Sequence, residues 1–359
     1  MNLLAPIGIV YGRIMDVRNR LFDSGYLRTH DLGARTISIG NLTTGGTGKT
    51  PLVELAAEIL ANAGEKVCVL TRGYGRSDPG RRVLVSDGEA VLADAAAGGD
   101  EPVELARKLL KKAVVVADRD RVGAAAWAKE RFGITTFVLD DGFQHRRVNR
   151  DLDIVCIDAT NPCGNGRILP AGSLRESFRG LERADLIVIT RSEMSGPTGE
   201  IESRLRKRNA AAPIIRSTTR VTGIVRVGGH DPGTADTFEK LKAHLGNDGP
   251  GGPVKVLAFC GLGNPGAFFG LLKAESAKHN GDLFAVEAEK AFPDHHDYSQ
   301  EDIDVMEAEA RRAGISAFLT TGKDSVKLEK LGLSIPTFSV EIKFELSEPD
   351  LFRSLVTAS

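Results

Sequence analysis

The chain has 359 residues, which is more than one small domain needs and enough for two. Apolar residues make up 42% and charged residues 26%, a composition typical of a soluble globular protein with a sizeable core. The net charge is −1, from 47 basic and 48 acidic residues, so nothing indicates a nucleic-acid partner. The four cysteines form no C-x-x-C pair, which argues against structural zinc and against a disulfide framework. Cys68, Cys156 and Cys260 lie in apolar strand-like runs and are interpreted as core residues.

The N-terminal residues 1–27 have the pattern of an amphipathic helix, with apolar residues at helical spacing: Leu3, Leu4, Ile7, Tyr11, Ile14, Val17 and Leu21. Arg13 interrupts the apolar run, so the segment is not a signal peptide. No stretch of about eighteen apolar residues is present to span a membrane. Periodicity alone favours a helix packed on its own domain over one lying in a membrane interface.

Apolar β-branched runs then alternate with helix-like stretches, in the order expected of an α/β fold. The predicted strands are 35–40, 66–71, 113–117, 135–140, 152–158 and 185–190, and the clearest helices are 50–63 and 101–112. Because these strands lack strict alternation, we expect a mostly parallel sheet buried on both faces. A smaller α/β block, with strands 255–260 and 316–320, follows the glycine- and proline-rich stretch 246–253, which we expect to be flexible.

The segment GGTGKT (45–50) lies between the strand 35–40 and the helix 50–63, the context that a nucleotide phosphate loop requires. Gly45, Gly46 and Gly48 allow backbone N–H groups to converge on phosphate oxygens at the start of the helix. In this interpretation Lys49 reaches the β- and γ-phosphates, and the Thr50 hydroxyl is a Mg²⁺ ligand. The usual pattern, G-x-x-x-x-G-K-[ST], has a glycine where this chain has Thr43. A threonine there is strained only if its φ must be positive.

Asp140 ends the strand 135–140 and Asp141 follows it, at the place where phosphate-loop proteins commonly hold Mg²⁺. A GTPase would carry N-K-x-D to recognise guanine, and the nearest candidate, residues 321–324 (TGKD), has the wrong spacing. The site therefore favours a kinase or another ATPase over a GTPase.

Further polar clusters lie at strand ends or in glycine-rich loops: TRGYGR (71–76), GDEP (99–102), DDGFQHRR (140–147), GNGRILPAGSLRE (164–176) and FPDHHDYS (292–299). Each alone could be a turn or a helix cap. His295 and His296 could also be an exposed pair or zinc ligands, but no cysteine or third histidine has a ligand spacing. Together and in this order the clusters resemble one family, the tetraacyldisaccharide 4'-kinases, which are the lipid A 4'-kinases of Gram-negative bacteria.

The resemblance extends from the N-terminal helix to about residue 328 and includes the loop Asn41 to Pro51 with its irregular Thr43. It implies a phosphate-loop NTPase-like α/β/α domain over 1–217, completed by 343–359, and a smaller α/β domain over 218–342. A two-stranded hinge would join the two domains, and residues 1–27 would form an interfacial helix. The departures are small: Ser173 stands where a proline is expected, Gly322 where a glutamate is expected, and Thr71 where a serine is expected.

The resemblance also implies the reaction, transfer of the γ-phosphate of ATP to the 4'-hydroxyl of tetraacyldisaccharide 1-phosphate to give lipid IVA. Asp100 would be the base, with His295 as its partner and Lys49 stabilising the transferred charge. ATP would bind to Thr43, Thr44, Gly45, Gly46, Thr47, Gly48, Lys49 and Thr50. Mg²⁺ would bind to Thr50, Asp140 and Asp141. The lipid head group would bind to Arg72, Arg121, Asn165, Arg175 and Glu176.

Several expectations about Arg121, partners and location accompany this interpretation. Arg121 is the weakest of the site candidates, because the DRDR segment around it (118–121) could be a solvated charged turn. We expect a monomer, bound peripherally to the cytoplasmic face of the inner membrane and to its lipid substrate. Two alternatives remain open: a phosphate-loop kinase for a soluble small molecule, and a switch or assembly ATPase.

Overall fold

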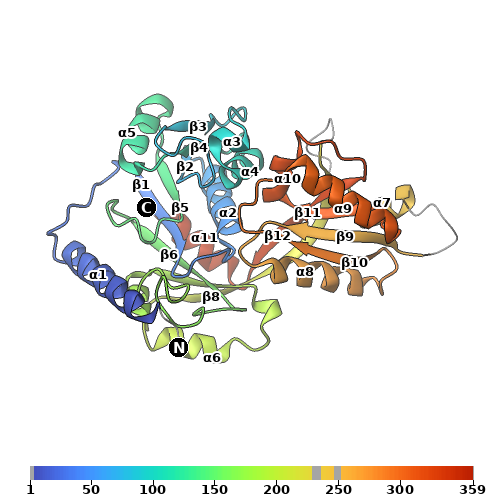
Figure 1. Ribbon diagram of the computed structural model, residues 1–359. Coiled ribbons are helices and arrows are strands. Elements are labelled where there is room, and N and C mark those ends of the chain that lie inside the picture. The colour runs from blue at the N-terminus through green and yellow to red at the C-terminus, as the bar shows by residue number, and fades with distance from the viewer. Residues whose placement is uncertain (1–3, 229–235, 246–251, 359) are drawn as a thin grey trace. The chain divides into compact units, whose positions relative to one another are not determined.

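The computed structural model describes residues 4–228, 236–245 and 252–358, and it divides into two compact units (Figure 1). The first unit consists of Met1–Thr218 and Phe344–Ser359, and the second of Thr219–Lys343. Two strands, β8 (Ile214–Arg226) and β12 (Thr337–Leu346), begin in one unit and end in the other. Most of the stretch 246–253, where we expected flexibility, lies outside the described residues.

The strands of the first unit follow the order β8-β7-β6-β1-β5-β2-β4-β3. Their bounds are β1 Arg35–Asn41, β2 Val67–Thr71, β3 Val83–Ser86, β4 Ala113–Ala117, β5 Thr136–Asp140, β6 Leu152–Asp158 and β7 Leu186–Thr190. Every pairing in this part of the sheet is parallel except that of β3 with β4. The predicted strands and the mostly parallel α/β fold are therefore confirmed.

Helices cover both faces of this sheet, which explains why central strands such as β2, β4 and β5 are buried along their whole length (Figure 1). They are α1 Ala5–Asp23, α2 Lys49–Asn62, α3 Ala95–Gly98, α4 Asp100–Lys108, α5 Arg121–Phe132, α6 Gly199–Arg206 and α11 Pro349–Thr357, with the 3₁₀ turns η1 Phe178–Arg183 and η2 Ser192–Met194. Alternate residues such as Cys68 and Leu70 of β2 pack against Ala124 of α5. Cys68, Cys156 and Cys260 are buried free thiols, as expected of core residues.

The predicted helix 101–112 was too long at its C-terminal end. α4 ends at Lys108, and the backbone N–H of Leu109 closes its last turn on the carbonyl of Leu105. The chain must then reverse to enter β4 at Ala113, and Lys111 takes a positive φ of 62° in that turn. The residues 109–112 carry no glycine or proline, so no local signal indicates that the helix ends at Lys108.

The second unit has a smaller parallel sheet in the order β10-β9-β11-β12. Its remaining elements are β9 Val254–Cys260, β10 Phe284–Ala291, β11 Ala317–Thr321, α7 Phe238–Leu245, α8 Pro265–Lys278, α9 Gln300–Arg312 and α10 Gly322–Leu328. Residues of β9 alternate between two cores: Val256 packs with Leu272 of α8, whereas Leu257 packs with Ile303 of α9. This alternation buries both faces of the strand, as a parallel sheet requires.

Candidate active site

The phosphate loop joins β1 to α2, and glycines provide the backbone conformations that side chains disfavour. Gly45 has a φ of 99° and Gly48, the N-cap of α2, has a φ of 74°. Lys49 and Thr50 form the first turn of α2, so the free N–H groups and positive potential of the helix N-terminus lie at the loop. The hydroxyl of Thr190, at the end of β7, donates to the carbonyl of Thr47 at 2.9 Å and holds the loop from a strand that lies two positions away from β1 in the sheet.

Thr43 keeps an ordinary backbone conformation, because it is not among the residues with positive φ. It forms an isolated antiparallel bridge with Leu174, and next to it the N–H of Thr44 donates to the carbonyl of Ser173 at 2.7 Å. The side-chain amide of Asn41 donates to the carbonyl of Thr43 at 2.8 Å. The start of the loop is thus held by backbone pairing to residues 173–174, a role that a threonine fills without strain.

Lys49 lies between the side chains of Asn41 and Asp141, with a hydrogen bond to the first and an ion pair with the second. Its ammonium is 3.3 Å from Oδ1 of Asn41 and 3.6 Å from Oδ1 of Asp141. Asp141 follows β5 with a φ of 52°, and its other oxygen accepts from Arg175 at 2.6 Å. Burial acts to raise the pKa of Asp141, but the charges of Lys49 and Arg175 outweigh it and lower that pKa to about 2. Asp141 therefore stays ionised and orients both cations.

Asp140, the last residue of β5, behaves in the opposite way. Its side chain is 4% exposed, and burial, together with the charges of Glu101 and Asp141, raises its pKa to about 6. The hydroxyl of Thr71 donates to Oδ2 of Asp140 at 3.0 Å. A nearby cation would stabilise the ionised form of a buried carboxylate with so elevated a pKa, and this makes Asp140 a candidate functional residue.

The donor set fits Mg²⁺. Asp140 and Asp141 supply carboxylates and Thr50 a hydroxyl, the hard oxygen ligands that Mg²⁺ prefers. Oδ1 of Asp141 is buried and has no hydrogen-bond partner. Among the described residues no group of three or more His, Cys, Asp or Glu side chains could hold a metal. Such a pair of carboxylates suits Mg²⁺ bound partly by substrate phosphates.

The two arginine candidates near Asp140 differ in their surroundings. Arg121 begins α5, is 3% exposed, and donates to the carbonyl of Asp140 at 2.5 Å. Burial lowers its pKa, and the charges of Asp140 and Asp141 oppose that shift. Arg121 is thus part of the site's wall, and the alternative of a solvated turn is wrong for this residue. Arg72 is exposed and donates to the hydroxyl of Tyr74 at 3.1 Å.

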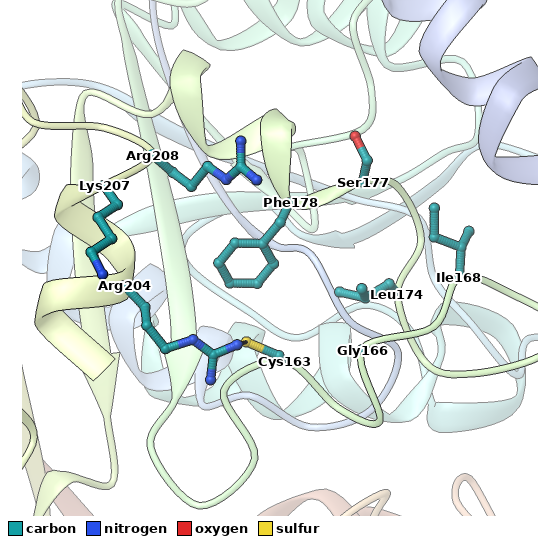
Figure 2. Close-up of a pocket in the computed structure, with 9 residues that line it drawn as sticks. All are labelled: Cys163, Gly166, Ile168, Leu174, Ser177, Phe178, Arg204, Lys207 and Arg208. Carbon is teal, nitrogen blue, oxygen red and sulfur yellow. Dashed lines mark hydrogen bonds between the residues drawn. The ribbon is translucent and has the colours of Figure 1, made fainter. Parts of the chain in front are cut away.

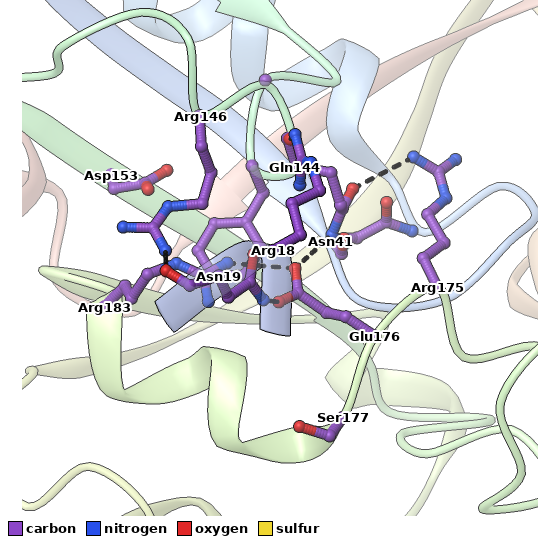
Figure 3. A network of polar contacts seen from close by, with 12 residues as sticks. Arg18, Asn19, Asn41, Gln144, Arg146, Asp153, Arg175, Glu176, Ser177 and Arg183 are labelled. Atoms are coloured by element: carbon purple, nitrogen blue, oxygen red, sulfur yellow. Dashed lines mark hydrogen bonds and ion pairs between the residues drawn. The ribbon is translucent and has the colours of Figure 1, made fainter. Parts of the chain in front are cut away.

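Glu176 is the centre of a buried polar network (Figure 3). The side chain is 1% exposed, and its two oxygens accept from three donors. Asn19 of α1 donates to Oε2 at 2.7 Å, while Gln144 and Arg183 each donate to Oε1 at 3.0 Å. The carboxylate therefore joins the N-terminal helix to the loop after β5, and it leaves little room for a ligand.

Gln144 extends this network to the phosphate loop. Its amide also donates to the backbone carbonyl of Asn41 at 2.9 Å, and its oxygen lies 3.4 Å from Arg175, which pairs with Asp141 (Figure 3). Asn41 in turn accepts from Lys49. We had assigned no role to Gln144 or Asn41, although both belong to the motifs that carried the resemblance.

Asn165 stabilises its own loop. Its amide donates to the carbonyl of Ala171 at 3.2 Å, and its oxygen accepts from the N–H of Arg167 at 3.2 Å. These local contacts fix the turn before Leu174, the residue that pairs with Thr43.

Asp100 is the first residue of α4 and is 3% exposed. Gly99 before it has a φ of 94°, and a Cβ there would lie 2.8 Å from the carbonyl oxygen of Tyr74. The GDEP and RGYG motifs therefore pack backbone against backbone. Only a glycine at position 99 permits this close approach, which places Asp100 beside residues 73–74.

In the second unit, the loop after β10 holds a second polar cluster. His295 has a φ of 61°, and its Nε2 lies 3.2 Å from Nζ of Lys323. Lys323 also donates to Asp294 at 2.9 Å. His296 instead stacks on Phe292 and bonds Asp302 at 3.0 Å, as a packed structural residue does. His295 therefore lies in a polar cluster with Asp294 and Lys323, whereas His296 is packed against Phe292.

α1 has two different faces. Gly8 and Gly12 are buried, and a Cβ on Gly12 would lie 2.7 Å from Cδ1 of Ile168. On the opposite side an apolar stripe, Ile7, Val10, Ile14 and Val17, is more than half exposed. Within the described part of the chain, no helix is long and apolar enough to cross a membrane.

Comparison with known proteins identifies the family. A profile described as tetraacyldisaccharide-1-P 4'-kinase matches residues 1–359. The chain belongs to this family. A tetraacyldisaccharide 4'-kinase from Geobacter metallireducens is 37% identical over 97% of this chain and 95% of its own, and one from an Anaeromyxobacter species (strain Fw109-5) is 40% identical over 99% and 92%.

A solved structure agrees with the fold. The kinase of this family from Aquifex aeolicus, crystallised in complex with ATP, is 30% identical and superposes with a TM-score of 0.73 over 98% of this chain and 97% of its own. The family inferred from the polar clusters, and the phosphate-loop α/β fold that it implied, are therefore confirmed.

Proposed function

We propose that this kinase transfers the γ-phosphate of ATP to the 4'-hydroxyl of tetraacyldisaccharide 1-phosphate, giving lipid IVA in lipid A biosynthesis. The observation that carries the proposal is the phosphate loop of a family member with its lysine held between Asn41 and Asp141. The relatives named above are kinases of this substrate, and the Aquifex aeolicus protein binds ATP. A pre-oriented Lys49 is suited to the charge that develops on the transferred phosphoryl group.

The nucleotide would lie on residues 43–50, with the backbone N–H groups of the loop around its phosphates. Thr50, Asp140 and Asp141 would hold Mg²⁺, which when bound neutralises phosphate charge. Asp140 must be deprotonated to do this, and its raised pKa makes that step sensitive to pH near 6.

Asp100 is proposed as the base that accepts the proton of the 4'-hydroxyl. It is buried at a helix N-terminus, with Oδ1 2.9 Å from the N–H of Glu101. His295, already beside Asp294 and Lys323, is proposed as its partner. Asp100 belongs to the first unit and His295 to the second, so the pairing rests on the family resemblance and on the two-stranded hinge that the resemblance implies.

The test of the base is the variant Asp100→Ala. It should lower kcat more than it raises the KM for ATP, because the proton acceptor acts in the transfer step and does not bind the nucleotide. Unchanged kcat would refute the assignment.

For the lipid head group we retain Arg72 and Arg175 as direct ligands, since each presents a guanidinium that is at least partly accessible. Arg121 would act from the buried wall beside Asp140. Asn165 and Glu176 are better suited to shaping the site, because their polar atoms are already bonded within the protein.

The exposed apolar stripe of α1 is proposed to lie in the membrane interface at the cytoplasmic face of the inner membrane, where the acyl chains of the substrate reside. The protein would be a monomer bound peripherally. Flotation with liposomes tests this: wild type should float, and a variant with Ile7, Val10, Ile14 and Val17 changed to Ser should not. Equal recovery of both proteins in the dense fraction would exclude the interfacial helix.

One reaction distinguishes the proposed function from its alternatives. Purified protein is incubated with γ-labelled ATP, Mg²⁺ and tetraacyldisaccharide 1-phosphate, and the lipids are separated by chromatography. A labelled lipid with one added phosphate supports the proposal, and Lys49→Ala serves as the inactive control. Slow release of labelled phosphate without a labelled lipid would instead indicate a switch ATPase or a kinase for a soluble acceptor.

A further inference from the structure

A cavity lies in the first unit between the loop 163–178 and α6, apart from the groups assigned to phosphoryl transfer. Its volume is about 490 Å³, within the range of ligand-binding pockets. We call it the α6 pocket, and it is lined by Cys163, Gly166, Ile168, Leu174, Ser177, Phe178, Arg204, Lys207 and Arg208. Figure 2 shows the ring of Phe178 between the basic side chains of α6 and its C-terminal end on one side and Leu174 and Ile168 on the other.

The α6 pocket has an apolar floor and a cationic rim. Ile168, Leu174 and Phe178 supply the floor, and the lining surface is mostly apolar. Three cations, Arg204, Lys207 and Arg208, stand at the rim, and within the described residues none of them forms an ion pair with a carboxylate. An apolar cavity beside uncompensated positive charge is complementary to an anionic amphiphile, whose chain enters the cavity and whose head group meets the cations.

Two residues that line the α6 pocket also contact α1, the helix proposed to lie in the membrane interface. Ile168 packs where Gly12 lacks a side chain, and the hydroxyl of Ser177 donates to Asp16 at 2.9 Å. A third, Leu174, bridges to Thr43 of the phosphate loop. A lipid in the pocket would therefore lie beside both the interfacial helix and the segment that holds the loop.

We propose that the α6 pocket binds an anionic phospholipid of the membrane, with an acyl chain over Ile168, Leu174 and Phe178 and its phosphate at Arg204, Lys207 and Arg208. Such a lipid is a binding partner additional to the phosphorylated substrate. It would add headgroup recognition to the apolar contact of α1, because basic side chains near a membrane favour anionic lipids.

Cys163 provides a direct measurement, because it lines the pocket whereas Cys68, Cys156 and Cys260 are buried. The rate of Cys163 modification by a maleimide is measured with monomeric dihexanoyl phosphatidylglycerol and with dihexanoyl phosphatidylcholine, and Cys163→Ser confirms the origin of the signal. Phosphatidylglycerol should slow labelling about tenfold at about ten times its Kd, and phosphatidylcholine should protect less.

Charge variants make the test specific. Lys207→Gln/Arg208→Gln should abolish the difference between the two lipids, whereas Arg206→Gln, an exposed position of α6 outside the pocket, should preserve it. Arg204 is left unchanged, because its guanidinium lies 3.4 Å from the Cys163 sulfur and would alter the thiol itself. All these positions are at the surface of the first unit, and a thermal unfolding curve checks that the variants fold.

Three outcomes would overturn the proposal. Equal protection of Cys163 by both lipids would show that the pocket does not distinguish lipids by their head-group charge. Protection of Cys163 by inorganic phosphate alone would show that the pocket is a simple anion site. Protection by tetraacyldisaccharide 1-phosphate at concentrations where phosphatidylglycerol has no effect would assign the pocket to the substrate. Since the measurement uses neither ATP nor transfer, it succeeds or fails independently of the proposed kinase reaction.

Discussion

Replacing Glu176 tests whether this residue binds substrate or holds the site together. Glu176→Ala removes a carboxylate that is 1% exposed and leaves Asn19, Gln144 and Arg183 without their acceptor. Glu176→Gln keeps the shape and one oxygen. If Asn19 reverses its amide, so that its oxygen accepts from the new NH₂ group, most of the hydrogen bonds can be retained.

The expected magnitudes follow from burial and charge. Arg183, with its side chain 18% exposed, would lose its partner in Glu176→Ala, and removing one member of a buried ion pair lowers the free energy of unfolding by about 3–5 kcal/mol. Glu176→Gln should lower it by about 1–2 kcal/mol, since hydrogen bonds to a charged group are exchanged for neutral ones. Glu182→Ala, an exposed glutamate of the same 3₁₀ turn, is the matched control, expected within about 0.5 kcal/mol of wild type.

The sole tryptophan makes the assay local, because Trp127 belongs to α5 of the first unit. Urea unfolding is followed by its fluorescence, alongside steady-state kinetics for ATP and lipid. If Glu176 positions the site, wild type should be the most stable, Glu176→Gln less stable and Glu176→Ala the least stable. The kcat should fall in the same order, because the hydrogen bonds that position Lys49 are progressively lost. If Glu176→Ala were as stable as Glu182→Ala and only its lipid KM rose, Glu176 would be a substrate ligand and our reasoning would be wrong.

Three further changes probe the remaining charged groups. Lys49→Ala should abolish transfer to any acceptor, measured as labelled product, while a comparable rate would remove the phosphate loop from the mechanism. Asp140→Asn should also end transfer, but it should stabilise the fold by roughly 2–3 kcal/mol at pH 8, because burial moves the pKa of this carboxyl from 3.8 to about 6 and disfavours its charged form. This gain in stability should shrink as the pH falls from 6 towards 4. Unfolding curves in which the difference between variant and wild type does not depend on pH would contradict the prediction. Lys323→Met should lower kcat about tenfold or more with little change in the KM for ATP, since the ammonium orients Asp294 and His295; an unaltered kcat would exclude Lys323 from the site.

The parts of the structure that were predictable are those determined by short segments of sequence. Buried parallel strands such as β4 (AVVVA) and β7 (LIVIT) appear as nearly unbroken apolar runs, and a glycine-rich turn between a strand and a helix has few other interpretations. The end of α4 at Lys108 was missed because the chain reversal before β4 depends on where the sheet lies, and nothing in residues 109–112 interrupts a helix.

The missed site residues share a different cause, which is long sequence separation between partners. Asn19 and Glu176 are 157 positions apart, Asn41 and Gln144 are 103 apart, and no periodicity connects such pairs. The burial of Arg121 was not predicted for the same reason: its charged neighbours suggest solvent, whereas the fold buries its guanidinium against the carbonyl of Asp140. Motif resemblance identified the segments, but only the folded chain shows which side chains bond to one another.

The threonine at position 43, where phosphate loops usually have glycine, is explained by the contacts of the loop with residues 173–175. A glycine is needed at this position only where the backbone must adopt positive φ, and here Thr43 forms a bridge with Leu174 and has no positive φ. The segment 173–175 takes over the support of the loop: Ser173 accepts from Thr44, and the N–H of Arg175 donates to the carbonyl of Leu42 at 2.8 Å. Because the same segment carries Arg175 and lines the α6 pocket, displacing it would move the phosphate loop and the ion pair with Asp141 together.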